Sequence, residues 1–129
     1  MGADRRRRDL GVRVTVPEAY QGEIWFCDLN PIRGHEQTGS RPAVVISVDQ
    51  LGAGASELAI VVPLTRTNRP SPLYVAIDPP EGGVRERSYA MPEMVRSISR
   101  ERLSARWGTI SGQKLADIAH RVHILTRTA

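Results

Sequence analysis

The sequence runs Gly34-His35-Glu36-Gln37-Thr38-Gly39-Ser40-Arg41-Pro42 and continues directly into Ala43-Val44-Val45-Ile46-Ser47. The first part is polar and bracketed by glycines, which is typical of a loop, and it ends in a single arginine. The second part is nearly continuous in apolar character and predicts a strand over 43–48 that is buried on both faces. A loop that stands on a rigid strand and ends in an arginine is suited to binding an anion, because a guanidinium presents a planar fork of N–H donors.

The composition is that of one small soluble domain. The chain has 129 residues, of which 40% are hydrophobic and 5% aromatic, enough for a modest core. No apolar run approaches the roughly 18 residues of a membrane span, and the charged N-terminus does not resemble a secretion signal. The single cysteine, Cys27, excludes an internal disulfide and fits a reducing cytosol. It is expected to be a small buried strand residue, and no Cys/His cluster predicts a metal site.

Positive charge is concentrated at the N-terminus. Residues 1–16 contain five arginines and two aspartates, whereas the remainder of this chain of net charge +4 is nearly neutral. We expect residues 1–16 to be a disordered basic arm and residues 17–129 to be the folded domain. The arm could attract phosphates, or it could be a spacer or a mis-annotated start. Of the 18 basic residues only Lys114 is lysine, which suits phosphate binding but is also explained by a GC-rich genome.

Short β-forming segments alternate with turn residues along most of the chain. Pro42 is expected to open its strand rather than lie inside it, and residues 50–56 are expected to be a flexible connection. One helical turn is predicted over 100–103, and an amphipathic helix capped by Ser111 over 111–125. The predicted strands span residues 24–29, 43–48, 57–64, 73–77, 89–91, 93–99 and 107–110. This pattern predicts a small curled antiparallel sheet or barrel with one helix packed on it.

Residue types alone leave the chemistry open. Arg41 could bind an anion, or it could be the surface ion-pair partner of Glu36, and it is expected to be exposed. Thr65, at a predicted strand end, could donate to a phosphate oxygen or be an ordinary β-branched strand residue. His35 could transfer protons near neutral pH or be a solvated loop residue. The two other histidines, on the predicted C-terminal helix, are expected at the surface.

Taken as a pattern, these segments resemble the MazF/PemK family of toxin endoribonucleases. The resemblance is carried by residues 22–31 (Gly-Glu-Ile-Trp-Phe-Cys-Asp-Leu-Asn-Pro) and by the loop and strand of residues 34–47. It continues through Val62-Pro63-Leu64-Thr65 and the block of residues 90–103, and it covers about residues 20–127.

The resemblance implies a fold and an activity. The fold would be a compact, mainly β, SH3-like barrel with a C-terminal helix, paired as a homodimer. The activity would be cleavage of single-stranded RNA at short motifs by a cytoplasmic toxin that needs no metal or other cofactor. A cognate antitoxin of the MazE kind would block it by laying a flexible tail over the RNA groove.

The resemblance also implies roles for particular residues. Arg41 and Thr65 match the catalytic arginine and threonine of the family, and Glu36 and Gln37 match loop positions that shape the active site. His35 and Arg66, which adjoin these residues, are further candidates for the active site and RNA contact. Both catalytic candidates could direct donors at the charge that builds on phosphorus when the ribose 2′-OH attacks it. Met94 stands where many relatives carry glutamine, so the resemblance predicts the RNA sequence preference less well than the activity.

Two other functions compete with this interpretation. A CcdB-like toxin of the same fold would bind DNA gyrase without cleaving RNA, but this chain has the Arg41 and Thr65 pair and ends in Arg-Thr-Ala rather than Trp-Gly-Ile. A peptide-binding SH3-like module would need clustered aromatic residues. The single Phe, two Trp and three Tyr residues are scattered along the sequence.

Overall fold

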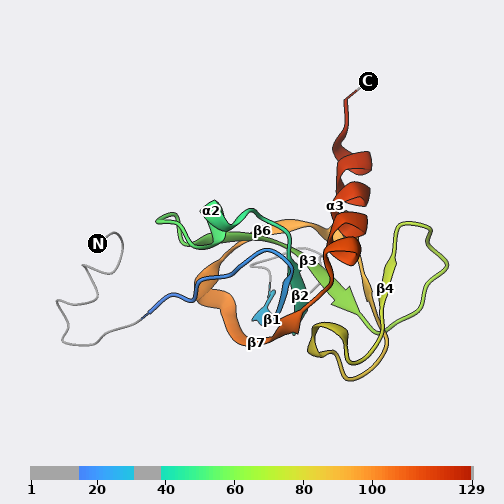
Figure 1. Ribbon diagram of the computed structural model, residues 1–129, viewed down its shortest axis with the longest axis horizontal. Coiled ribbons are helices and arrows are strands. Elements are labelled where there is room, and N and C mark those ends of the chain that lie inside the picture. The colour runs from blue at the N-terminus through green and yellow to red at the C-terminus, as the bar shows by residue number, and fades with distance from the viewer. Residues whose placement is uncertain (1–14, 31–38, 129) are drawn as a thin grey trace.

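The computed structural model describes residues 15–30 and 39–128. Within these residues the chain forms an antiparallel sheet that curls into a half-barrel, with one long helix at the C-terminus (Figure 1). The expected architecture is therefore confirmed. The basic arm falls almost entirely on residues 1–14, which lie outside the described part of the chain.

Seven strands make up the sheet in the described residues. Their spatial order is β4-β5-β3-β2-β1-β7, and β6 also pairs with β3. The strands are β1 (Glu23–Asp28), β2 (Ser40–Val45), β3 (Leu58–Thr65), β4 (Val75–Ile77), β5 (Ser88–Ala90), β6 (Arg96–Ser99) and β7 (Leu103–Thr109). Each pairing is antiparallel.

Strand β3 joins the parts of the sheet. Its first half pairs with β6, its middle with β2, and its last two residues, Leu64 and Thr65, with β5. The four residues 61–64 are all buried, because neighbouring segments cover this strand on both faces. β3 therefore delivers its C-terminal residue, Thr65, to a fixed position at the end of the sheet.

The core consists of two hydrophobic clusters, one on each face of the central strands. Val44 and Val62 belong to the first cluster, and Ala43, Val45 and Val61 belong to the second. Since successive residues of a strand point to opposite faces, β2 and β3 contribute to both clusters. The prediction of a strand over 43–48 that is buried on both faces is therefore confirmed for residues 43–45.

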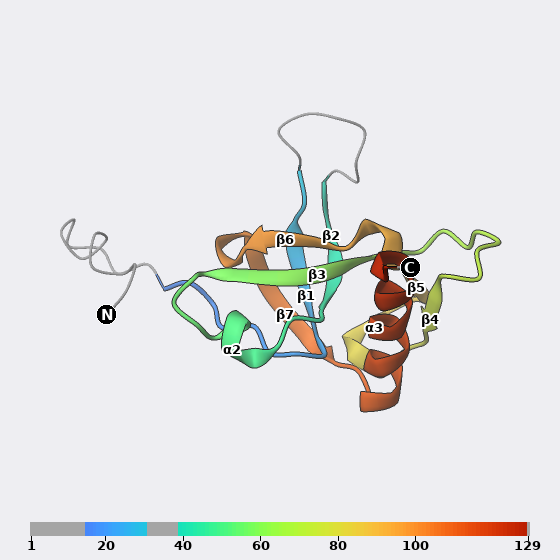
Figure 2. The same cartoon turned by 90° about the horizontal axis from the view of Figure 1, so that it is seen from above.

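The C-terminal helix α3 (Gly112–Thr126) follows the predicted pattern. Ser111 caps it by accepting a hydrogen bond from the backbone N–H of Lys114, at 3.1 Å. Ile118 is fully buried in the first cluster, and Leu115 and Val122 pack against it on the same helix face. The helix lies beside β4, at the opposite end of the sheet from α2 (Asp49–Gly52) (Figure 2). No helix of the described residues is long and apolar enough to cross a membrane.

Two predictions about β2 are wrong. β2 starts at Ser40, so Pro42 lies inside the strand. β2 pairs with β1 at Pro42, but it pairs with β3 only from Ala43 onward. The side of Pro42 that faces away from β1 therefore has no strand partner, and a proline is tolerated there. β2 also ends at Val45, and Val48 is 55% exposed.

The connection over 50–56 is not simply flexible, because it begins with the short helix α2. The backbone N–H of Gln21 donates to the Asp49 carboxylate at 2.8 Å and ties this helix to the segment before β1. Local sequence does not encode that tie.

Three 3₁₀ turns complete the described chain: η2 (Glu81–Gly83), η3 (Pro92–Met94) and η4 (Arg100–Arg102). The last matches the predicted helical turn. It places Arg100 in the interior, where the guanidinium donates to the carbonyls of Pro17 at 2.8 Å and Gly54 at 2.5 Å. The segment before β1 and the segment after α2 are thereby held together.

Candidate functional site

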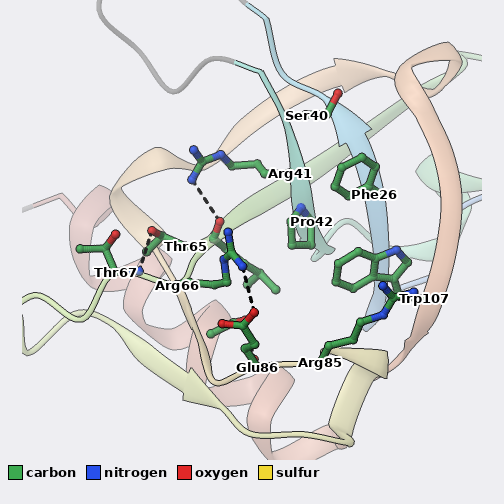
Figure 3. Close-up of a pocket in the computed structure, with 12 residues that line it drawn as sticks. Phe26, Ser40, Arg41, Pro42, Thr65, Arg66, Thr67, Arg85, Glu86 and Trp107 are labelled. Carbon is green, nitrogen blue, oxygen red and sulfur yellow. Dashed lines mark hydrogen bonds and ion pairs between the residues drawn. The ribbon is translucent and has the colours of Figure 1, made fainter.

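A pocket of about 770 Å³ opens where β2 starts and β3 ends. β1 and β7 form one side of it, and the segments after β3 and before β5 form the other (Figure 3). Its lining combines arginines, hydroxyl groups and aromatic rings. The lining residues are Phe26, Ser40, Arg41, Pro42, Leu64, Thr65, Arg66, Thr67, Arg85, Glu86, Ser88 and Trp107.

Arg41 is the second residue of β2, and its guanidinium reaches across to β3. One terminal nitrogen donates to the Leu64 carbonyl at 3.3 Å, although the two residues are 23 apart in sequence. The Nε is buried and has no hydrogen-bond partner among the described residues. Arg41 is half-buried, so the prediction of an exposed side chain is wrong: it lies in the pocket wall between two strands. The Leu64 carbonyl thus fixes one terminal nitrogen of the guanidinium, and the other terminal nitrogen can donate to an anion.

Thr65 is the last residue of β3 and lies next to the carbonyl that anchors Arg41. Its hydroxyl oxygen accepts a hydrogen bond from the backbone N–H of Thr67 at 3.1 Å. A hydroxyl carries one proton besides its acceptor lone pairs, so Thr65 can still donate that proton to a ligand. The structure therefore brings Arg41 and Thr65 to the same pocket.

Arg66 also lines the pocket, and it is paired with Glu86. The nitrogen and carboxylate oxygen are 3.0 Å apart, and both side chains are mostly exposed. An exposed pair of this kind contributes at most about 1 kcal/mol, so a phosphate can replace Glu86 at little cost. Spacing along the sequence did not reveal this partner of Glu86.

The pocket is cationic. Among its lining residues, Arg41, Arg66 and Arg85 carry positive charge and Glu86 alone carries negative charge. The excess sits on guanidinium groups, which bind phosphate oxygens through directed N–H donors. This arrangement favours a ligand with one or more phosphates.

Two aromatic residues form a wall that sequence reasoning missed. The rings of Phe26 in β1 and Trp107 in β7 stack with their centroids 5.7 Å apart and their planes at 8°. Both lie in predicted strands, but nothing local indicates that β1 and β7 are neighbours. These two aromatic residues are therefore neighbours in the fold, although they are far apart in the sequence.

Cys27 takes no part in this chemistry. It is fully buried in the second cluster, as expected, and its thiol donates to the Arg41 carbonyl at 3.5 Å. Burial raises the pKa of the Cys27 thiol to about 11, and the nearby Asp28 acts in the same direction against Arg96 and Arg102. The thiol therefore remains neutral at physiological pH and is no nucleophile.

The remaining candidates divide into two groups. His35, Glu36 and Gln37 lie in residues 31–38, outside the described part of the chain. His120 and His123 are exposed on α3, as expected. In the described ranges, no group of three or more His, Cys, Asp or Glu side chains is placed to hold a metal ion.

Comparison with known proteins identifies relatives over almost the same residues. Residues 20–126 match a protein family described as PemK-like, MazF-like toxins of type II toxin–antitoxin systems. The endoribonuclease MazF9 of Mycobacterium tuberculosis is 38% identical over 111 residues, which cover 81% of this chain and 94% of that protein. The endoribonuclease EndoA of Bacillus subtilis is 36% identical over 86 residues, covering 65% of this chain and 73% of that protein.

Solved structures show the same fold at lower identity. A crystal structure of MazF from Deinococcus radiodurans superposes with a TM-score of 0.75 at 24% identity, covering 89% of this chain and 100% of that one. An endoribonuclease from a mycobacterial species, solved in complex with its cognate antitoxin, superposes with a TM-score of 0.63 at 18% identity. That alignment covers 86% of this chain and 93% of the other.

Proposed function

Because the chain belongs to the family of PemK-like, MazF-like toxins of type II toxin–antitoxin systems, we propose that it is the toxin of such a system and cleaves RNA. The observation that carries this proposal is its similarity to endoribonucleases, 38% identity along 94% of MazF9. These matches lend no support to a gyrase-binding, CcdB-like toxin.

The substrate is single-stranded RNA, and the pocket supports a reaction without a metal. The ribose 2′-OH attacks the adjacent phosphorus, negative charge builds on the phosphoryl oxygens, and the 5′-oxygen leaves. Arg41, anchored on the Leu64 carbonyl, and Thr65, with a free hydroxyl proton, direct donors at that charge. The products are a 2′,3′-cyclic phosphate and a 5′-OH end.

The other pocket residues have supporting roles in this proposal. Arg66 exchanges Glu86 for an RNA phosphate. Glu36 and Gln37 shape the active site from the preceding loop, and His35 is a candidate to move a proton. Arg41 acts by electrostatic stabilisation, because a guanidinium with a pKa above about 12 gives up protons poorly.

The partners follow from the same family membership. A relative from a mycobacterial species was solved with its cognate antitoxin, and we expect a MazE-like antitoxin to inhibit this chain by covering the cationic pocket. We also propose that the toxin domain comprises residues 17–129, acts as a homodimer and works in the cytoplasm, where its RNA substrate lies. Residues 1–16 form the basic arm.

The test is incubation of the purified protein with a long RNA in EDTA, followed by mapping of the cleavage ends. We expect cuts within one short motif that leave cyclic phosphate and 5′-OH ends. Replacing the ribose on the 5′ side of the cut by deoxyribose should prevent cleavage, because it removes the attacking hydroxyl. Intact RNA in EDTA, or cleavage that appears only after a divalent metal is added, would contradict the proposal.

A further inference from the structure

Phe26, one of the two rings of the Phe26–Trp107 stack, lies outside the hydrophobic core of the described residues. Phe26 is half-buried and belongs to neither of the two hydrophobic clusters of the described chain. Its ring stacks on Trp107, whose own side chain packs against the first cluster. A large apolar ring placed at a pocket wall, outside the core, gives up burial that would stabilise the fold. Such a position is typical of a binding surface.

The stack lies across the pocket from the two proposed catalytic residues. Figure 3 shows Phe26 and Trp107 on one side, Arg41 and Thr65 on the other, and Pro42 between them. Pro42 and Phe26 are direct partners in the β1–β2 register, so both side chains project from the same face of the sheet. The pocket thus presents flat apolar surface at one end and N–H and O–H donors at the other.

A nucleotide is complementary to both ends of this pocket, because a sugar joins its flat base to an anionic phosphate. The pocket volume of about 770 Å³ is within the range of small-ligand sites and accommodates one nucleotide. Trp107 is held in place, since its ring packs on both Phe26 and the core and its backbone lies against Gly83. A preorganised platform loses little side-chain entropy when a base stacks on it.

We propose that the Phe26–Trp107 stack binds one unpaired base of the RNA, adjacent to the phosphate held at Arg41 and Thr65. This inference rests on the proposed function and adds to it the residues that hold a base. Stacking on an aromatic side chain requires an unpaired base, so the platform selects single-stranded over double-stranded RNA. The three arginines of the pocket attract the phosphates of RNA, so they favour RNA over an apolar peptide that has few acidic residues.

The test compares two ten-unit probes that carry the same phosphates. One is a random-sequence 2′-fluoro RNA, which lacks the attacking hydroxyl, and the other is the same 2′-fluoro sugar-phosphate chain without bases. We expect the full-length protein to bind the RNA about tenfold or more tightly than the abasic chain. Trp107→Leu and Phe26→Leu should bring that ratio towards one, and Trp107→Phe, which keeps a ring, should retain part of it.

Trp25 supplies the matched control, because it is a strand tryptophan that does not line the pocket and packs against the second cluster. Trp25→Phe should leave the ratio of affinities unchanged. It also leaves Trp107 as the single tryptophan of the chain, so fluorescence reports on the platform without altering it. The RNA probe should quench that fluorescence, and the abasic chain should not.

The outcomes separate this inference from the function on which it rests. If the protein cuts RNA but Trp107→Leu keeps the wild-type ratio, or if the RNA fails to quench Trp107, the platform is disproved and the nuclease stands. If the RNA quenches Trp107 and the ratio falls in Trp107→Leu although the protein cuts no RNA, the nuclease is disproved and the base-binding site stands.

Discussion

At the scale of single residues, the site depends on two side chains fixed by backbone atoms. Arg41 is anchored on the carbonyl of Leu64, and Thr65 accepts from the N–H of Thr67. Each is therefore oriented by β3 and the turn that follows it rather than by another flexible side chain. Fixed donors of this kind lose little free energy to reorganisation when charge develops on a substrate.

Arg41→Ala should reduce RNA cleavage in EDTA by about a thousandfold, because a preorganised donor to the transition state is lost. The fold should persist with a loss of only about 1 kcal/mol of stability, since one hydrogen bond to Leu64 is removed. The measurements are kcat/KM on the mapped RNA motif and the midpoint of urea unfolding.

Arg87→Ala is the matched control. Arg87 is exposed, pairs with Asp78 at 3.4 Å and does not line the pocket, so cleavage should be nearly unchanged. A folded Arg41→Ala protein that cleaves at the wild-type rate would disprove the role of Arg41.

Cys27 predicts a pH dependence of stability. Burial raises its pKa to about 11 in the folded chain, above the value near 9 of an ordinary thiol. Between these values the unfolded chain has lost the proton and the folded chain keeps it, so the free energy of unfolding falls as the pH rises. Over this window Cys27 lowers the free energy of unfolding by about 1.4 kcal/mol per pH unit. Below pH 9 it contributes no pH dependence.

The measurement is urea unfolding from pH 8 to pH 10.5 for the wild type and for Cys27→Ala. Titration of other groups is common to both proteins, so only the difference between their slopes reports on Cys27. Parallel pH curves for the two proteins would show that the thiol is not desolvated in the folded chain.

At the scale of the elements, the turn η2 supports the strand that carries Trp107. Gly83 has a φ of +78°, and a Cβ placed on it would lie 2.3 Å from the Trp107 carbonyl oxygen. A side chain at this position would be strained and would push β7 away. The close approach of η2 to β7 therefore helps set the position of the aromatic wall.

Gly83→Ala should lower the free energy of unfolding by about 2 kcal/mol, because it combines an unfavourable φ with a clash against backbone. Gly112→Ala is the control: a Cβ there meets nothing within 4 Å, at the start of α3, and should be neutral or slightly stabilising. Thermal and urea unfolding of the two variants provide the comparison, and equal stabilities would contradict the assigned role of Gly83.

Elements governed by local pattern were predictable, and those governed by distant contacts were not. β3 and α3 follow from apolar continuity and from helical spacing after a capping serine. The start of β2 at Ser40 and the helix α2 depend on strand pairing and on a hydrogen bond from Gln21, which the local sequence does not encode.

The candidate site divides in the same way. Residue types left Arg41 and Thr65 as candidates with alternatives, the family resemblance gave them catalytic roles, and the structure places both in one pocket. The Phe26–Trp107 wall could not be predicted, because it needs β1 beside β7, which are joined by contacts such as Ser104 to the Phe26 carbonyl, 78 residues apart. Its only local signal was two aromatic residues in separate predicted strands.

At the scale of the whole molecule, charge is distributed unevenly along the chain. The folded part is nearly neutral overall, yet its pocket gathers three arginines against one glutamate, and the N-terminal residues add a further basic cluster. The arginines of the pocket offer directed hydrogen-bond donors to RNA phosphates at short range. An arm of this composition attracts RNA by its net charge, and salt screens that attraction.

Removal of residues 1–16 should therefore weaken the salt dependence of RNA affinity more than it changes the cleavage rate of bound RNA. Each lost phosphate contact lowers the slope of log affinity against log salt by about 0.7 for a single strand. Truncation at this point keeps Pro17, whose carbonyl accepts from Arg100. Affinities at several salt concentrations and single-turnover rates are the measurements.

A second variant, in which Arg5, Arg6, Arg7 and Arg8 are all replaced by Gln, keeps the length of the arm and removes four charges. It should behave like the truncated protein. Equal salt slopes for all three proteins would show that the arm makes no RNA contact.

The position of β3 has a consequence for how this protein would be inactivated. The same strand belongs to both hydrophobic clusters and ends at the pocket, so Thr65 cannot be released by fraying of a peripheral loop. The backbone amides of Val61, Val62 and Leu64 should exchange with deuterium only through global opening of the molecule. Heat should then abolish catalysis and secondary structure in one cooperative step. The half-life of the toxin's activity on heating is therefore set by the unfolding of the whole domain and not by local loss of the active site.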